Sequence, residues 1–289
     1  MKKLFLAVFM LSVAASAFAS EANRIYLGLE AGNYSYREPH MQYPIQDSGN
    51  KIGASLEWVG RSILAQSGLM EESDRSFATF EFRYITGKVD YDGFLMDGTP
   101  FKKDGLDDYY FEGRITFGAT YDIGNKFELW PYLGFGYRYL VNDGTNVDDA
   151  FYRRISKYWY VPIGAKIRKE VTEKFSITLT GEFDWFQGGE QATDLLPAAA
   201  SLGLESYIYN YQPEGWGIRF GLKAEAAVNQ NFGIFFEPYY RMWKIQNSNL
   251  GVTESLPNGG MTGAPGLPVG GIEPFNITRE AGIRAGFYF

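Results

Sequence analysis

The sequence contains no cysteine and only one histidine, His40, among its 289 residues. Without cysteine the chain has no disulfide framework, no thiol nucleophile and no cysteine metal site. It also has no zinc signature and no glycine-rich phosphate loop between a strand and a helix. The sequence therefore predicts no metal site and no cofactor.

Long hydrophobic runs and an excess of basic residues are missing as well. After residue 19 no run of about 18 apolar residues occurs, which excludes a helical membrane protein. Residues 20–289 carry 25 basic and 34 acidic side chains, a net charge of −9, so nucleic acid is not an expected partner. No linker or change in composition divides these residues, which indicates a single domain.

The first residues have the features of a secretory signal peptide. Lys2 and Lys3 precede a short apolar run over 4–15, and Ala17 and Ala19 form an Ala-x-Ala cleavage site. The run is too short to cross a bilayer as a helix, and the polar residues 20–24 disfavour the alternative of an N-terminal membrane anchor. We predict cleavage after Ala19, export of the chain, and one mature domain over 20–289.

The last fourteen residues, 276–289, alternate strictly between apolar and polar side chains. Ile283 and Phe287 fall on one parity, while Glu280 and Arg284 fall on the other, which is the period of a β-strand. The sequence therefore predicts a strand with one apolar and one charged face.

This strand, with its aromatic-x-Phe ending, resembles the closing strand of bacterial outer-membrane β-barrels. The resemblance implies residence in the bacterial outer membrane. It also implies that Phe287, Tyr288 and Phe289 contribute to the signal that the barrel-assembly machinery reads.

Nine earlier segments show the same alternation, each long enough to cross an outer membrane, where about 9–11 tilted residues suffice. With the last strand the segments are 24–34, 51–60, 76–85, 109–122, 128–140, 155–168, 175–186, 215–228, 232–244 and 276–289. We predict an all-β fold, a transmembrane antiparallel up-and-down β-barrel of about ten strands, with eight or twelve as alternatives. The connection 61–75 is long for a turn and could hold a short helix or strand extensions. Pro131, Pro162 and Pro238 predict a bulge or strand end nearby.

The connections alternate in length, as a membrane barrel requires. Those at 124–126, 169–174 and 229–231 are short, whereas 36–50, 86–108, 141–154, 187–214 and 245–275 are long, polar and rich in turn-forming residues. The sequence therefore predicts short periplasmic turns, long external loops and both termini on the periplasmic side.

The polar parity places a set of charged side chains inside the predicted barrel. Its members are Glu30, Glu57, Glu81, Arg83, Glu112, Arg114, Arg138, Lys166, Arg168, Glu182, Asp184, Arg219, Lys223, Glu225, Glu237, Arg241, Glu280 and Arg284. Residues two apart on a strand share a face, which predicts the pairs Glu81–Arg83, Glu112–Arg114, Arg219 and Lys223 with Glu225, Glu237–Arg241, and Glu280–Arg284. We interpret this lumen charge network as mutually neutralised and closing the lumen; the alternative is a narrow ion-selective path.

A soluble barrel or sandwich would turn its apolar parity inward. About twenty charged side chains on the other parity are too many for a soluble core, which disfavours that alternative. The outward segment ends are aromatic and resemble membrane-interface girdles: Tyr34, Trp58, Tyr84, Tyr121, Trp159, Trp185, Trp216 and Tyr240.

Omptin proteases are similar in size and strand count, and that resemblance implies paired aspartates near one loop and an Asp–His pair near another. Asp90 and Asp92 match the first feature in part. The second is missing, because His40 lies in the first long connection, and 187–214 offers Asp194 and Glu205 without a histidine. Ser35 and Ser48 lie near His40 in sequence, but no third group for a hydrolytic triad is evident. We predict no catalytic residues.

Two features of the long connections remain as functional candidates. Acidic clusters at 90–97, 104–108 and 143–149 offer carboxylates for hard cations, but none has the spacing of a calcium loop, so we interpret them as solvated or as linked through divalent ions to lipopolysaccharide. The stretches 195–204 and 256–272 are apolar for exposed loops, which is typical of contact sites.

The sequence as a whole therefore predicts an outer-membrane barrel with a charged, largely closed lumen. We expect it to act through its external loops, by binding an extracellular ligand via 187–214 and 245–275, or as a structural envelope component. A narrow-pore channel is the second interpretation, and an outer-membrane hydrolase is the third.

Overall fold

The computed structural model describes residues 23–63, 75–94, 98–147, 152–194, 207–253 and 269–289. Its strands are β1 (Arg24–Glu38), β2 (Ile45–Arg61), β3 (Ser76–Phe94), β4 (Pro100–Ala119), β5 (Tyr121–Gly124), β6 (Phe127–Asp143), β7 (Arg153–Thr172), β8 (Phe175–Asp194), β9 (Tyr207–Gln212), β10 (Gly215–Ala227), β11 (Gly233–Ile245), β12 (Gly251–Thr253), β13 (Val269–Gly271) and β14 (Asn276–Tyr288). No helix in this part of the chain is long and apolar enough to cross a membrane.

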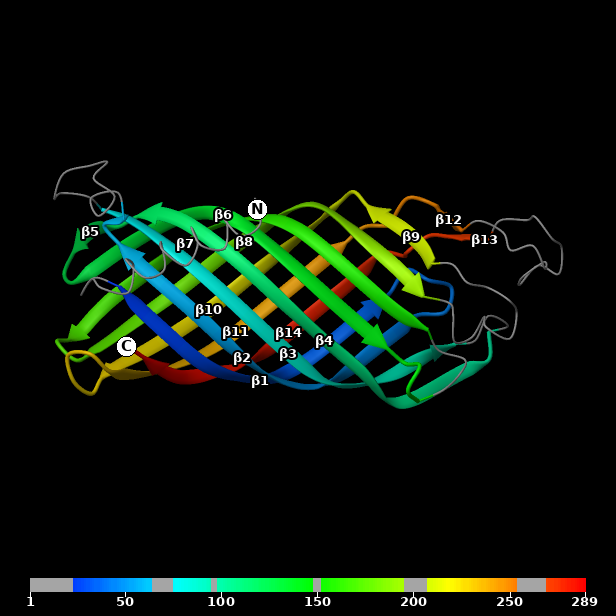
Figure 1. The fold of residues 1–289 in the computed structure, drawn as a ribbon, viewed down its shortest axis with the longest axis horizontal. Helices are drawn as coiled ribbons and strands as arrows, with labels where there is room; N and C mark the ends of the chain where they lie inside the picture. Colours follow the sequence, from blue (N-terminus) through cyan, green and yellow to red (C-terminus); the bar gives the residue numbers. More distant parts are fainter. Residues whose placement is uncertain (1–22, 64–74, 95–97, 148–151, 195–206, 254–268) are drawn as a thin grey trace, which may run out of the picture.

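The strands wind around a closed, elongated barrel (Figure 1). Within the described residues ten strands form the ring, in the order β1, β2, β3, β4, β6, β7, β8, β10, β11 and β14. Each pairs antiparallel with its neighbours, and β14 closes the ring against β1 from Tyr26↔Tyr288 to Arg37↔Ile277. The predicted ten-stranded antiparallel barrel is confirmed.

The two ends of the barrel differ (Figure 1). One end, here called the turn end, carries the short connections 125–126, 173–174 and 228–232, together with Arg24 and Phe289. At the tight turn after β5, Asn125 and Lys126 adopt left-handed φ values of 54° and 64°, as hairpin turns between twisted strands require. The opposite end, here called the loop end, carries β9, β12 and β13.

Two strands are interrupted without losing their register. β9 and β10 both pair with β8, and the break between them falls at Pro213, which cannot donate to the ladder. β4 and β5 both pair with β6, and β4 ends at Ala119, opposite Pro131. The ladders also have gaps opposite Pro162 and Pro238. The predicted irregularities near the prolines therefore occur as gaps and strand ends.

The wall of the barrel has its apolar side chains outside and its charges inside. On the outer face Leu29 is 73% exposed and Ile52 is 66% exposed, whereas Glu112 and Arg138 on the inner face are each 1% exposed. Water on the outside would make this arrangement unfavourable, because it leaves large apolar side chains solvated and buries charges. Hydrocarbon makes it favourable, provided that the backbone groups are paired within the wall, as they are along the ladders of this barrel except at the gaps opposite the prolines.

Aromatic side chains form part of a girdle toward the loop end. The register sets Tyr84 opposite Phe111, and Phe111 opposite Tyr139 with stacked rings 4.8 Å apart. The register also sets Trp185 opposite Trp216. The prediction for Tyr34 was wrong: this ring is buried inside the barrel, because Tyr34 has the parity of Glu30 rather than that of Leu29.

The strands are longer than predicted and extend into the predicted long loops, and 86–108 in particular is mostly strand. β3 contains 19 residues and β4, β7 and β8 contain 20 each, roughly twice what a bilayer crossing needs. The connection predicted at 36–50 is reduced to 39–44. Beyond the membrane the outer face meets water, so the apolar alternation stops while the backbone pairing continues.

A charged substitution on the outer face, in the middle of the wall, tests whether this face contacts membrane lipid. We expect Leu133→Arg, at a position 61% exposed, to lower the free energy of unfolding in phospholipid vesicles by about 2–4 kcal/mol, because it places a cation in hydrocarbon. The matched control is Val252→Arg, at an exposed site of the loop end, where about 0.5 kcal/mol or less is expected. Equal effects at the two sites would contradict the membrane assignment.

Candidate functional site

The strands bring the predicted lumen charge network onto one inner wall. Fifteen of its eighteen members are buried, while Lys166, Arg168 and Glu237 are half-buried. Each sits on the inward parity of its strand, so the alternating pattern alone positions it. What the network does depends on which charges meet across the lumen.

Most partners differ from the along-strand pairs that the sequence suggested. Glu81 and Arg83 do form an ion pair, but Arg114 pairs with Glu182. Residues two apart on a strand lie about 6.6 Å from each other, whereas long basic side chains in a narrow barrel can reach acids on strands across the lumen. The other cross-lumen pairs are Lys223 with Glu57, Arg241 with Glu30, Arg138 with Glu280, and Arg219 with Glu112. Arg284 pairs with Glu237, its directly opposed neighbour on the adjacent strand.

Glu112, in the middle of the barrel, accepts four hydrogen bonds from three side chains. Arg219 donates to its two carboxylate oxygens at 2.6 and 2.8 Å, and Arg83 donates at 3.2 Å. The Tyr160 hydroxyl donates to the same carboxylate at 2.7 Å. A buried carboxylate held by two guanidinium groups fixes β4 relative to β3 and β10.

Removal of this carboxylate takes one counter-charge from each of two buried cations, although Arg83 keeps Glu81 and Arg219 keeps Asp184. We therefore expect Glu112→Gln to lower the free energy of unfolding by about 1.5–3 kcal/mol, the contribution of a charged hydrogen bond. The control is Asp107→Asn, which breaks an exposed pair with Lys88 and should cost about 1 kcal/mol or less. Denaturant titrations in lipid vesicles measure both, and equal losses would contradict the stabilising role assigned to Glu112.

Toward the loop end the interior of the barrel holds four buried side chains, Tyr110, Arg138, Tyr160 and Trp243, which we call the closing layer. All four are at most 1% exposed. Trp243 packs edge-on against Tyr160 at 5.0 Å, and the Arg138 guanidinium lies 3.9 Å from the ring centre of Tyr110. On the loop-end side of this layer the hollow described measures about 20 Å³, enough for about one water molecule.

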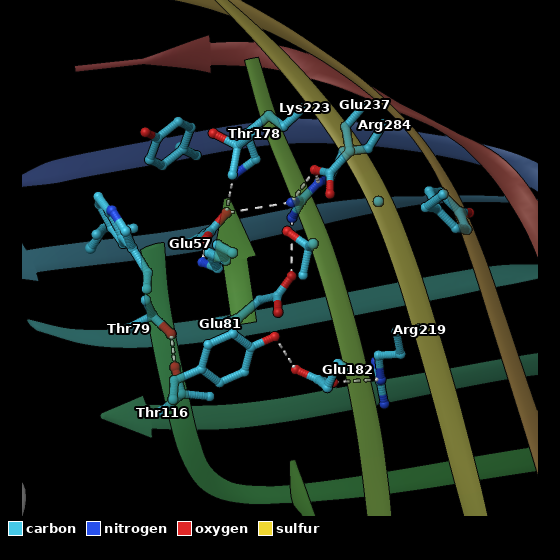
Figure 2. Close-up of a pocket in the computed structure, with 18 of the residues that line it drawn as sticks. Glu57, Thr79, Glu81, Thr116, Thr178, Glu182, Arg219, Lys223, Glu237 and Arg284 are labelled. Carbon is cyan, nitrogen blue, oxygen red and sulfur yellow. Dashed lines mark hydrogen bonds and ion pairs between the residues drawn. The ribbon is translucent and has the colours of Figure 1, made fainter. Parts of the chain in front are cut away.

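Between the closing layer and the turn end the barrel contains a larger space, here called the luminal cavity (Figure 2). Its volume is about 340 Å³, at the lower end of the range for small-molecule sites. Figure 2 shows Glu57 and Lys223 joined across it, and Glu182 near Arg219. Thr79 and Thr116 exchange a hydrogen bond of 2.6 Å on its wall.

A second cluster of charge lies at the loop end, where Glu38, Asp47 and Glu273 surround Arg154. We call it the loop-end acid cluster. Arg154 donates to Glu38 at 3.1 Å and to Asp47 at 3.3 Å, and Tyr36 donates to Glu38 at 2.6 Å. Burial raises the pKa of Asp47 to about 7 against the opposing effect of Arg154. Burial likewise raises the pKa of Glu273 to about 7.

These raised pKa values predict a dependence of stability on pH. The folded protein binds protons at Asp47 and Glu273 more tightly than the unfolded chain does, so stability falls as the pH rises from about 4 through 7. We expect the protein to be less stable at pH 8 than at pH 5, by a few kcal/mol at most.

Asp47→Asn isolates this effect, because the amide stays neutral across the range. The variant should reduce the difference in unfolding midpoint between pH 5 and pH 8, as followed by tryptophan fluorescence. The control Asp107→Asn, at an exposed carboxylate of the loop end, should keep the full difference. An unchanged difference in Asp47→Asn would refute the assignment.

The omptin-like positions do not form a protease constellation in the described residues. Asp92 pairs with Lys102 at 2.6 Å, and Asp90 accepts a hydrogen bond from the Gly105 amide. His40 stacks on Phe275 with ring centres 4.5 Å apart. Asp194, at the end of β8, lies opposite Arg153 in the register.

Several sequence predictions fall outside the described residues. They are the signal peptide with Ala17 and Ala19, the apolar stretch 195–204, most of 256–272, Asp97, Asp148 and Asp149. Among the described residues no group of three or more acidic or histidine side chains is arranged to hold a metal ion. Phe287 and Phe289 point outward with Phe232 beside them, and Tyr288 points inward against Tyr26; their role in assembly stays a prediction.

The structure adds partners that the sequence analysis missed. Hydroxyl groups of Tyr26, Tyr110, Tyr132 and Tyr160 donate to carboxylates of the lumen charge network. Lys51 pairs with Asp108, which the sequence had assigned to an exposed loop cluster. The alternation along β4 would have identified Tyr110 and Asp108 as inward-facing, because both are an even number of residues from the inward-facing Glu112.

Comparisons with known proteins agree with this architecture. No protein-family model matches the sequence, and no curated protein matches it either. Among solved structures the chain resembles the outer-membrane protease OmpT of Escherichia coli, with 11% identity and a TM-score of 0.56 over 92% of this chain and 96% of that one.

Two further barrels are more distant. The translocator domain of the autotransporter NalP from Neisseria meningitidis has 6% identity and a TM-score of 0.36, over 99% of this chain and 95% of that chain. The toluene transporter TbuX from Ralstonia pickettii has 8% identity and a TM-score of 0.35, over 93% and 90%. These two TM-scores are too low to support an inference about this chain. At 11% identity, the likeness to OmpT establishes the fold and not the function. The chain has the fold of a bacterial outer-membrane β-barrel.

Proposed function

We propose that this protein is an outer-membrane barrel that does not conduct and that acts through its loop end. The observation that carries the proposal is the closing layer, whose four side chains are at most 1% exposed. Ion pairs hold this layer in place, since Arg138 donates to Glu280 at 2.7 Å and Tyr110 donates to the same carboxylate at 2.6 Å. The burial of these four side chains supports a lumen without a continuous path for ions.

The proposal includes an orientation and two general partners. The short turns and both chain ends belong to the periplasmic side, and the loop end faces outward, as in membrane barrels in general. The outer apolar face contacts membrane lipid and lipopolysaccharide, and the closing strand β14 is recognised by the assembly machinery. Export through the signal peptide over 1–19 is part of the same proposal.

The loop end is suited to presenting a binding surface. β7 and β8 continue as paired strands to Arg153 and Asp194, which makes a rigid support outside the membrane. Exposed apolar side chains lie on β9 and near β12, among them Tyr209, Tyr211 and Leu250. Function carried by loops on a rigid scaffold is the common pattern. We propose an extracellular ligand or a structural envelope role, through 187–214 and 245–275.

Hydrolysis is not part of the proposal. His40 stacks on Phe275, and the carboxylates of Asp90 and Asp92 are engaged by a backbone amide and by Lys102. None of these contacts supplies an activated nucleophile or water.

Single-channel recording in planar bilayers tests the absence of conduction. We expect the intact protein to give no resolvable current, because the closing layer blocks the lumen. Tyr160→Ala combined with Trp243→Ala removes two rings of that layer and should produce openings, whereas Trp216→Ala, on the outer face, should stay silent. Heat-modifiable migration on gels verifies folding of each variant. Steady current from the intact protein would refute the proposal and favour a narrow pore.

A further inference from the structure

One wall of the luminal cavity combines basic side chains with hydroxyl groups in adjacent positions. Arg168 on β7 lies directly opposite Thr178 on β8, and Lys223 on β10 lies opposite the same threonine. One pair further along, Lys166 lies opposite Thr180. Directly opposed residues in antiparallel strands have Cα atoms about 4.5–5.5 Å apart. We call these five residues the cationic patch; Figure 2 labels two of them, Thr178 and Lys223.

The surface of the cavity carries an excess of positive charge. Ten arginine and lysine side chains line it, against five glutamates. Further acids that pair with these cations, such as Glu30, Glu112 and Asp184, are not part of the lining. The cations are therefore nearer to the cavity than their remaining counter-charges, and a low-dielectric wall strengthens the resulting potential.

Within the cationic patch the ion pairs are long or shared. The single carboxylate of Glu57 is shared by three cations: Lys223 at 2.7 Å, Lys166 at 3.4 Å and Arg284 at 3.4 Å. Arg168 lies 3.6 Å from Glu128 and 4.0 Å from Glu225. Strong charge-assisted hydrogen bonds are about 2.7–2.9 Å long, so Lys166 and Arg168 retain donor capacity.

The two threonines of the patch are also available. Neither Thr178 nor Thr180 makes a side-chain hydrogen bond within the described residues, although both line the cavity. A hydroxyl between two cations can donate to an oxyanion that the cations hold. Lys166, Arg168, Lys223 and the two hydroxyls thus form a ready set of donors on one wall.

Access to this wall is from the turn end. A polar hollow of about 210 Å³ beside the β7–β8 turn shares Arg24, Arg168 and Glu225 with the luminal cavity. The opposite side is blocked by the closing layer. A solute that reaches the patch therefore enters from the turn end.

We propose that the luminal cavity binds a small phosphorylated solute from the periplasmic side, held by the cationic patch. A phosphate group offers several charged acceptor oxygens to lysine, arginine and hydroxyl donors in a single small group. The cavity volume of about 340 Å³ limits the ligand to a small molecule. The site needs no conduction through the barrel; only the side of entry follows from the orientation proposed above.

Calorimetric titration of the folded protein with inorganic pyrophosphate at low ionic strength tests this binding. We expect the double variant Lys166→Gln/Arg168→Gln to weaken binding at least tenfold, because it removes two charged donors from the phosphate group. The matched control, Lys88→Gln/Arg153→Gln, removes the same two residue types from exposed loop-end pairs and should bind as the intact protein does. Equal weakening in both variants, or no binding to the intact protein, would overturn the proposal. Succinate as second titrant separates the chemical classes, and succinate binding as tight as pyrophosphate binding would refute the phosphate assignment.

A nearly isosteric substitution gives a second measurement that does not depend on removal of charge. The chain has no cysteine, so Thr180→Cys introduces a single thiol into the patch, and Val228→Cys places one at an exposed turn-end site outside it. For each variant we compare the reaction rate of an anionic thiol reagent with that of a cationic reagent of the same size. This ratio of rates should be about tenfold higher for Thr180→Cys than for Val228→Cys. Pyrophosphate should slow the reaction at 180 and not at 228. Equal reagent preference at the two sites, or no protection, would count against the site whether or not the barrel conducts.

Discussion

Every backbone N–H and C=O group in the membrane wall must find its partner on a neighbouring strand, because hydrocarbon offers none. This requirement forces the ten strands into a ring and gives each residue one of two environments. The outer environment accepts Leu29 and Ile52, and the inner one collects carboxylates, guanidinium groups and tyrosine hydroxyls. The lumen charge network is thus a consequence of closure: ten strands enclose so little space that the inner side chains must contact one another.

The inner charges then determine where the barrel is solid and where it is hollow. At the closing layer the inner side chains are large: Trp243, Tyr160 and Arg138 are buried, and the rings of Trp243 and Tyr160 pack against each other. Toward the turn end, smaller inner residues such as Thr178, Thr180 and Gly221 leave the luminal cavity. The same wall therefore carries large, packed side chains toward the loop end and leaves a charged space at the turn end. The difference lies in side-chain volume, since β7 and β8 stay paired through both parts, with one register shift in each.

The sequence predicted the parts of this structure that depend on period two. The strand count, the inner and outer faces and the eighteen inner charges all followed from alternation, and Tyr34 was misplaced only where its parity was ignored. The parts of β3 and β8 that extend beyond the membrane were missed. Their outward side chains face water and need not be apolar, so the sequence shows no alternation there. The pairing of Arg114 with Glu182 and the loop-end acid cluster were not predictable, because they depend on which strands face each other across the barrel.

The seam between β1 and β14 couples the two ends of the chain. Its first pair, Tyr26 and Tyr288, joins residues more than 250 positions apart, whereas the other neighbours in the ring follow one another along the chain. Hairpins can form early from nearby residues, but the ring becomes edgeless only when this most distant contact is made. Until then two full-length strand edges stay open to pairing with other chains. Folding of this barrel is therefore exposed to aggregation up to its final step, and a template that shields both edges would accelerate it.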